Sequence, residues 1–119
     1  MVALTITVNG ERSEARIVKK MHEHIVKNFL DTIIMAELQN GPKSGYDIIT
    51  YIHTKHGCLV SSGTVYSLLY SLERNNLLEG IWIDRKRVYK LTSKGTQTIQ
   101  TILASREKIR SLLSTILST

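Results

Sequence analysis

Apolar and polar residues alternate with a period of two at the start of the chain. Residues 3–8 place their apolar side chains on one side, which predicts a short strand that ends at Asn9-Gly10. The residues that follow are charged and helix-prone, so no adjacent strand is available to pair with it. We therefore expect residues 1–12 to form an N-terminal strand or arm.

The pattern then changes to helical spacing. From Ser13 to Gln39 the apolar residues recur every three or four positions, and Asn40-Gly41-Pro42 is a strong stop signal. The spacing predicts a helix capped by Ser13. Because the stretch is long for one globular helix, a second helix over residues 32–39, capped by Asp31, is also compatible with the pattern.

Two shorter helices are predicted next. Ser44 and Asp47 have the spacing of a capping box, which opens a helix that ends at His56-Gly57. This helix is expected to turn Tyr46, Ile49 and Ile52 inward. The other helix begins at Ser61 or Ser62 and ends near Asn75. Its apolar residues form one stripe that must face the core, namely Val65, Leu68, Leu69 and Leu72.

Residues 77–91 have the pattern of a β-hairpin. Two short β-prone runs flank a charged tip at residues 84–87, and Trp82 on the first run is expected to close the edge of the core. Three helices followed by a hairpin is the order of a winged helix-turn-helix. We therefore predict a mostly α fold with a small β-hairpin, in which residues 13–91 form a winged helix-turn-helix DNA-binding domain.

A final amphipathic helix is predicted from Lys94 to about Leu117, with Thr92-Ser93 as its cap. Its seam alternates three- and four-residue steps, as in a short coiled coil. The seam could pack on the long first helix of the same chain. We favour antiparallel pairing with a second protomer, because one winged helix covers too short a DNA site for useful specificity. Residues 92–119 are thus predicted to be a C-terminal dimerisation helix, with contacts at Ile99, Ile102, Leu103, Arg106, Ile109, Leu112, Leu113 and Ile116.

Composition narrows the class of protein. The 119 residues carry a formal net charge of +6 and are 42% hydrophobic, values that suit one small soluble domain with a polyanionic partner. No apolar run reaches the length of a membrane-spanning helix, and the first residues lack the features of a signal peptide. The single cysteine, Cys58, cannot form an intrachain disulfide. These features together indicate a cytoplasmic protein.

No arrangement of residues in the sequence indicates catalysis or a bound cofactor. There is no phosphate-binding glycine loop and no pairing of a nucleophile with a base, and the carboxylates are scattered. Cys58 with His53 and His56 falls short of a closed zinc site. We expect neither an enzyme nor a resident metal or cofactor.

Four motifs lie in order between residues 30 and 95, a little more than half of the chain. They are Leu38-Gln39-Asn40-Gly41-Pro42-Lys43-Ser44-Gly45-Tyr46-Asp47-Ile48, Ser61-Ser62-Gly63-Thr64-Val65-Tyr66, Leu72-Glu73 with Leu77-Leu78, and Tyr89-Lys90-Leu91-Thr92-Ser93-Lys94-Gly95. Together they resemble the PadR family of transcriptional regulators, which are small winged-helix repressors. Two positions depart from the family pattern, since Ser62 and Ser67 stand where the family usually has proline.

The resemblance implies a prokaryotic, nucleoid-associated regulator that represses transcription. The protein would act as a homodimer on double-stranded DNA and bind a palindromic operator. The short C-terminus is similar to the subgroup with a single dimerisation helix. Some members of the family bind flat aromatic effectors, so a small aromatic effector is a further partner that the resemblance implies.

The predicted helix 61–75 is the candidate recognition helix. Its apolar stripe faces inward, which turns the opposite side towards DNA. An α-helix fits into the major groove, and the free N–H groups at its N-terminus favour binding of a phosphate. The family keeps an aromatic residue at the position of Tyr66, for which we expect a mixed role in packing and phosphate contact. The predicted DNA-binding residues of this helix are Ser61, Ser62, Thr64, Tyr66, Ser67, Tyr70, Ser71 and Arg74.

The hairpin tip holds the densest basic cluster of the chain. In a winged helix this tip lies over the phosphate backbone or the minor groove, where cations fix position rather than read sequence. The predicted contacts are Arg85, Lys86, Arg87 and Lys90, with Lys43 as a lesser candidate. Arg74 is the only arginine on the outward helix face, so we expect part of the specificity to come from DNA shape and paired half-sites.

The pattern therefore predicts a sequence-specific DNA-binding repressor, with two alternatives. One is a winged-helix protein-interaction or assembly module of the transcription machinery. The other is a non-specific chromosome-binding protein. Absence of salt-dependent binding to any duplex favours the first alternative, and equal affinity for all sequences favours the second.

Overall fold

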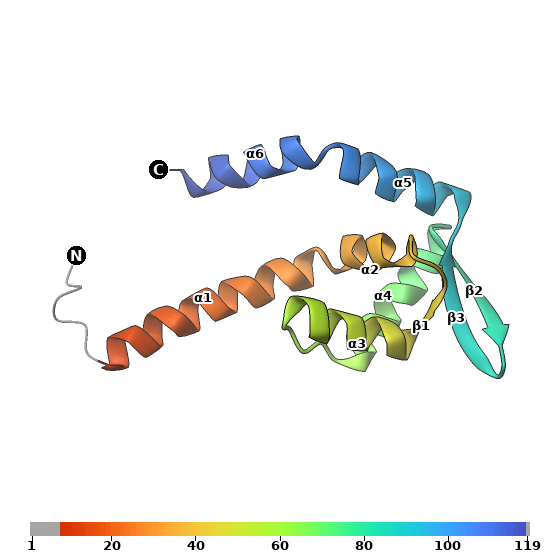
Figure 1. Ribbon diagram of the computed structural model, residues 1–119, viewed down its shortest axis with the longest axis horizontal. Coiled ribbons are helices and arrows are strands. Elements are labelled where there is room, and N and C mark those ends of the chain that lie inside the picture. Colours follow the sequence, from red (N-terminus) through yellow and green to blue (C-terminus); the bar gives the residue numbers. More distant parts are fainter. Residues whose placement is uncertain (1–7, 119) are drawn as a thin grey trace.

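The computed structural model describes residues 8–118, which form six helices and three strands (Figure 1). The first two helices, α1 (Val8–Asn28) and α2 (Leu30–Leu38), are separated only by Phe29, so the region from Ser13 to Gln39 contains two helices. The N–H of Phe29 donates to the C=O of Ile25, and the C=O of Phe29 accepts from the N–H of Ile33. Helical hydrogen bonding therefore continues through the bend between α1 and α2.

The first helix begins earlier than the sequence pattern predicts. It starts at Val8, so Asn9-Gly10 lie inside it and Ser13 is not its cap. A single strand with no partner leaves its backbone groups unpaired, whereas the charged, helix-prone residues after Gly10 favour helix. The remainder of the predicted strand, residues 3–7, lies outside the described residues.

The predicted cap of α3 (Gly45–His56) is confirmed, and α4 (Ser62–Arg74) begins at one of the two residues predicted for its start. Ser44 Oγ accepts from the N–H of Asp47 and the Asp47 carboxylate accepts from the N–H of Ser44, which completes the capping box. The inward face of α3 differs from the prediction. Ile48 and Ile52, one turn apart, are buried, and Tyr46 is 73% exposed because it lies two positions from Ile48 and so points to another face.

Three strands form an antiparallel sheet. The hairpin strands β2 (Leu78–Ile83) and β3 (Lys86–Leu91) pair along their length, and β1 (Lys43–Ser44) adds to the other edge of β3, giving the order β1-β3-β2. The hairpin turn consists of Asp84 and Arg85, both at positive φ (48° and 67°), as a tight two-residue turn requires. The tip is thus two residues long rather than four, and Lys86 and Arg87 belong to β3.

One hydrophobic core joins the helices to the base of the sheet. Its fully buried side chains come from α2, α3, α4, β2 and α5, and include Ile34, Ile52, Val65, Leu69, Leu78 and Ile99. Trp82 is not part of this core: it is 69% exposed, because it lies four residues beyond Leu78 and out towards the free end of the hairpin. The expectation that Trp82 closes the core edge was wrong.

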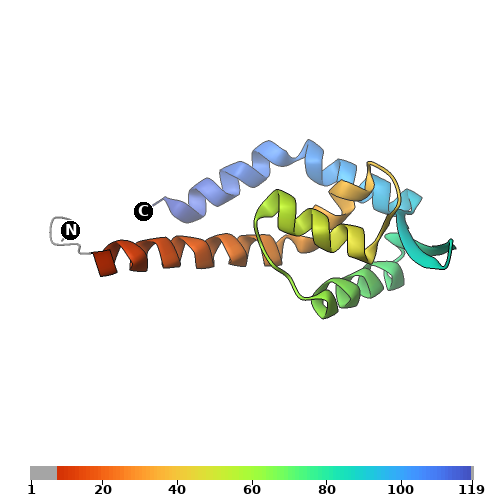
Figure 2. The same ribbon diagram turned by 60° about the horizontal axis from the view of Figure 1, so that its bottom comes forward.

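The C-terminal region also bends. α5 (Ser93–Ala104) is capped by Thr92, as predicted, and is followed after Ser105 by α6 (Arg106–Leu117). α1 and α6 extend from the same end of the molecule, opposite the hairpin (Figures 1 and 2). The molecule is therefore elongated, with extents of 58 × 32 × 21 Å. Within residues 8–118 no helix combines the length and the apolar character needed to cross a membrane.

Candidate nucleic-acid interface

The outer face of α4 is the most regular polar surface near the sheet. Val65, Leu69 and Leu72 are buried, which places the opposite face of the helix in solvent. The predicted DNA-binding residues that lie exposed on α4 are Ser62, Thr64, Tyr66, Ser67, Tyr70 and Arg74, while Ser71 is half-buried on the flank. The amphipathic division of this helix was therefore predicted correctly, apart from the partial burial of Ser71.

The first turn of α4 has its hydroxyl groups already engaged. Ser61 Oγ accepts from the N–H of Thr64 at 3.1 Å and shares a 2.7 Å hydrogen bond with Thr64 Oγ1. The N–H groups of Ser62 and Gly63 have no intrahelical acceptor, as at any helix start, and are the donors that a phosphate would meet. Ser62 occupies the first helical position, so the helix begins where the family's proline would start it.

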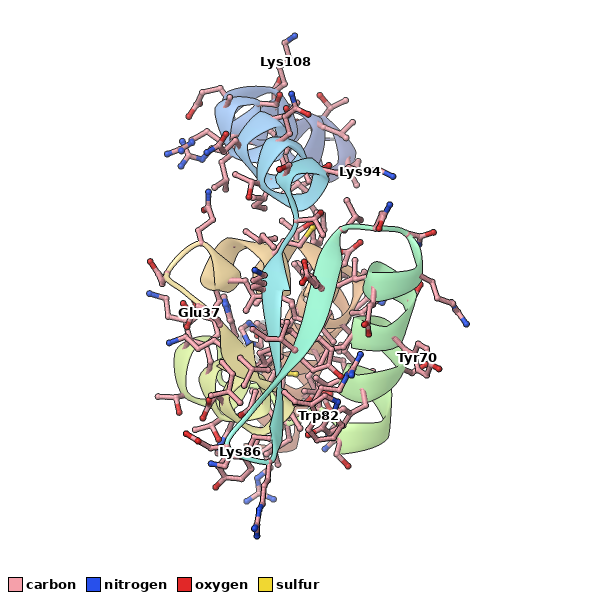
Figure 3. All side chains as sticks on the ribbon, turned by 90° about the vertical axis from the view of Figure 1, so that its right-hand side faces the viewer. Glu37, Tyr70, Trp82, Lys86, Lys94 and Lys108 are labelled. Carbon is pink, nitrogen blue, oxygen red and sulfur yellow. The ribbon has the colours of Figure 1, made fainter. Side chains whose placement is uncertain are left out.

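Two tyrosines on α4 have different surroundings. Tyr66 is 45% exposed, and its ring packs over Gly45 at the start of α3. Tyr70 is 65% exposed, and the guanidinium carbon of Arg74 lies 5.6 Å from its ring centroid. Tyr66 thus combines a packing role with an exposed edge, and Tyr70 projects from α4 into solvent (Figure 3) beside the exposed Arg74.

The wing places two cations at its free end. Arg85 is in the turn, Lys86 follows at the start of β3 (Figure 3), and both side chains are exposed. Lys86 also lines a pocket between the wing, α3 and α4, together with Ser44, Tyr46, Tyr66 and Arg87. This pocket joins the basic tip to the exposed edge of Tyr66.

The other two predicted lysines lie elsewhere on the sheet. Lys90 is exposed, but it lines a pocket with Pro42 and Thr96 on the α2 and α5 side of the hairpin. Lys43 is half-buried in β1, opposite Tyr89 of β3. The structure does not bring Lys90 to the face that carries α4.

Arg87, which is predicted to contact a phosphate, forms an ion pair with α4 in the structure. Its Nη2 donates to Glu73 Oε2 of α4 at 2.6 Å, and its guanidinium carbon lies 5.9 Å from the Trp82 ring centroid and 5.7 Å from that of Tyr89. A signal for this position exists in the sequence: Arg87 is two residues from the buried Tyr89, so it shares the strand face that turns inward.

The predicted dimerisation seam divides between two environments. Ile99 is fully buried in the core of its own chain, and Ile102 and Leu103 pack against that core, so Ile99 is not available to a partner. The remaining predicted contacts lie on α6: Ile109 is half-buried, and Arg106, Leu112, Leu113 and Ile116 are exposed. The bend at Ser105 produces this division, because it lets α5 follow the core while α6 leaves it.

Sequence reasoning missed a second apolar surface on α1. Its exposed apolar residues are Ile17, Val18, Met21 and Ile25, with Phe29 at the bend. In the described part of the chain α6 does not pack extensively on α1, so neither apolar face covers the other. The three- and four-residue spacing of its apolar residues is the sequence signal for this face.

The histidines and the cysteine do not form a site. Among the residues that the structure describes, no group of three His, Cys, Asp or Glu side chains is close enough to hold a metal ion. Cys58 is buried in the core. His56 packs against the edge of the Tyr51 ring, and its pKa is lowered by burial first and by the charges of Lys55 and His22 after that.

Comparisons with known proteins agree with this architecture. Of the solved structures, a PadR family transcriptional regulator from Eggerthella lenta superposes with a TM-score of 0.74 at 21% identity, covering 91% of this chain and 98% of that one. A PadR-like transcriptional regulator from Bacillus cereus gives a TM-score of 0.70 at 21% identity, covering 81% and 98%. Bacillus subtilis PadR in complex with operator DNA gives 0.55 at 27% identity, covering 62% of this chain and 46% of that one.

No curated protein matches the chain significantly. The sequence signature described as the transcriptional regulator PadR-like family matches residues 34–101, which run from α2 through α4 and the hairpin into α5. The matched residues are more than half of the chain and include the motifs at Gly45-Tyr46, Ser61–Tyr66 and Tyr89–Gly95. The chain belongs to the PadR-like family of transcriptional regulators, which are not enzymes.

Proposed function

We propose that this protein binds operator DNA through α4 and the tip of the wing, and that it represses transcription. The observation that carries the proposal is that the exposed Arg74, Tyr70 and Ser67 lie on the same helix as Tyr66, whose ring lines one pocket with Lys86 of the wing. The operator complex of Bacillus subtilis PadR supports this choice of ligand.

The two parts of this surface have separate tasks. The outer face of α4 enters the major groove, where the short side chains of Thr64 and Ser67 allow close approach to the base edges. Arg85 and Lys86 neutralise phosphates beside the groove and release counterions, which adds affinity without reading sequence. Arg74 is the one side chain of α4 suited to a bidentate contact with guanine. Few bases are therefore read directly, and DNA shape contributes the remaining sequence specificity.

A second copy of the chain completes the DNA-binding unit in this proposal. The apolar faces of α1 and α6 are exposed in one protomer, and burying such faces against a two-fold-related copy removes them from water. Two recognition helices related by a two-fold axis would read a palindromic operator with half-sites one helical turn apart. Where the operator overlaps a promoter, the bound dimer would then block access of RNA polymerase to that promoter.

The proposal is tested by selection and titration of DNA. The full chain is incubated with random-sequence duplexes, bound molecules are amplified and sequenced, and the affinity of the recovered duplex is measured across salt concentrations. We expect a palindromic consensus and a steep fall of affinity with salt. Binding to no duplex at any salt concentration would favour a protein-interaction module, and equal affinity for all sequences would favour a chromosome-coating protein.

A further inference from the structure

One carboxylate on the recognition helix holds both strands of the wing. Glu73 Oε2 accepts a hydrogen bond from Arg87 Nη2 of β3 at 2.6 Å and another from the N–H of Gly80 of β2 at 3.4 Å. Both charged side chains are partly buried, with exposed fractions of 37% for Arg87 and 27% for Glu73. Partial burial shields the pair from solvent and salt more than a surface pair, so the link is stronger than an exposed ion pair.

The rest of the Arg87 guanidinium lies against the wing itself. The rings of Trp82 and Tyr89 lie on its sides, and Gly80 lies beneath it, where an added Cβ would be 2.5 Å from Nη2. A planar guanidinium fits this narrow space and can stack on aromatic rings while it pairs with a carboxylate. A lysine ammonium would keep the charge but lose the stacking and the planar fit.

We propose, on the basis of the proposed function, that Arg87 is a positioning residue that holds the wing at a fixed angle to α4 through Glu73. It is not itself a phosphate contact. If Arg87 turned its Nη2 from Glu73 to a phosphate, an unpaired carboxylate would line the same groove as Tyr70 and Arg74. The fixed angle matters because α4 and the wing tip must meet the duplex at the same time, and a loose supporting contact weakens the specific complex first.

Two conservative variants separate positioning from phosphate contact. Glu73→Gln removes the charge of the carboxylate, and Arg87→Lys keeps the positive charge but not the stack. If Arg87 positions the wing, both variants lose about three- to tenfold in affinity for the duplex selected by the wild-type protein, while affinity for a shuffled duplex and the slope against salt stay unchanged. A merely structural role would not change the ratio of the two affinities.

A phosphate contact by Arg87 would change the affinities of the two variants in a different way. If Arg87 contacts a phosphate, Glu73→Gln frees it and raises affinity for both duplexes, and Arg87→Lys binds as the wild type does. Either outcome would overturn the proposal. Glu79→Gln is the matched control, because Glu79 is an exposed carboxylate of β2 and its removal changes the net charge by the same amount.

A measurement without DNA distinguishes this inference from the proposed function. Amide hydrogen exchange at Gly80 should be faster in Glu73→Gln and Arg87→Lys than in Glu79→Gln, since a neutral glutamine amide accepts from the N–H of Gly80 more weakly than the carboxylate does, and the lysine variant loses the planar link to Glu73. Unchanged exchange overturns the proposal whatever the DNA results are. A wild-type protein that binds neither duplex refutes the proposed function instead, and the exchange data then decide whether Glu73 and Arg87 hold the wing.

Discussion

The ring of Tyr66 on α4 lies directly over Gly45 in the first turn of α3. Gly45 is buried, and a Cβ at this position would overlap the ring carbons and the hydroxyl of Tyr66. The contact sets how closely the recognition helix approaches α3. It also directs the exposed edge of Tyr66 towards the pocket that Lys86 lines.

Gly45→Ala should therefore disturb both stability and binding. The added methyl group forces the Tyr66 ring or the helix to shift, and overpacking of this kind costs about 1–3 kcal/mol. We expect a lower free energy of unfolding in urea and weaker binding to the selected duplex. Gly63→Ala is the stability control: nothing lies within 4 Å of its Cβ position, so unfolding should be unchanged or stabilised by up to about 1 kcal/mol. Equal stability of Gly45→Ala and wild type would contradict the described contact.

Removing the cations at the wing tip should weaken binding to every sequence alike. In the double variant Arg85→Ala/Lys86→Ala, two phosphate contacts are lost, so the slope of log affinity against log salt should fall by about 2. The ratio of affinities for selected and shuffled duplexes should stay close to that of the wild type. Fluorescence anisotropy titrations at several salt concentrations measure both quantities. A slope equal to that of the wild type would show that the tip does not touch DNA.

Charges on the apolar face of α6 should separate the protomers. Leu113→Glu/Ile116→Glu places two carboxylates where we propose a second copy packs, and burial of unpaired charges in an interface is strongly unfavourable. We expect a monomer by sedimentation equilibrium, with affinity for a palindromic duplex reduced at least about tenfold. Lys108→Glu, on an exposed polar position of the same helix, provides the control. A wild-type protein that is monomeric at all concentrations would contradict the dimer.

Stability should fall as the pH drops below the ordinary pKa of histidine. Burial, with the charges of Lys55 and His22, lowers the pKa of His56 in the folded state, so below about pH 6.5 the unfolded chain binds more protons than the folded one. The contribution of His56 is complete above that pH and is lost as the pH falls towards its folded pKa. Urea unfolding of wild type and His56→Gln over a pH series measures this, and equal pH slopes for the two proteins would refute it.

Much of the fold follows from local sequence signals. The caps at Ser44, Ser61 and Thr92 are short-range hydrogen bonds between a side chain and a nearby N–H, so their sequence spacing is sufficient to predict them. The hairpin and the inward stripe of α4 are predictable for the same reason. The two-residue strand β1 is too short to show alternation, and only its pairing with β3 defines it.

The site was less predictable because tertiary contacts place neighbouring residues of the sequence in different surroundings. The run Arg85-Lys86-Arg87 looks uniform in sequence, but the tight turn and the strand pairing send Arg87 towards Glu73, fourteen positions earlier. The seam 99–116 likewise looks continuous, although the bend at Ser105 leaves its first part in the core and its last part in solvent. Both the position of Arg87 and the division of the seam depend on contacts with residues distant in the sequence, which local patterns do not show.

The central claim is that the outer face of α4 lies on DNA, and one titration tests it directly. Ser67→Asp places a negative charge in the middle of that face, and Ser93→Asp makes the same change at the exposed start of α5. The duplex selected by the wild-type protein is titrated with both variants at one salt concentration. We predict that Ser67→Asp loses at least about tenfold in affinity while Ser93→Asp binds as the wild type does. Equal affinity of Ser67→Asp and wild type would contradict the claim.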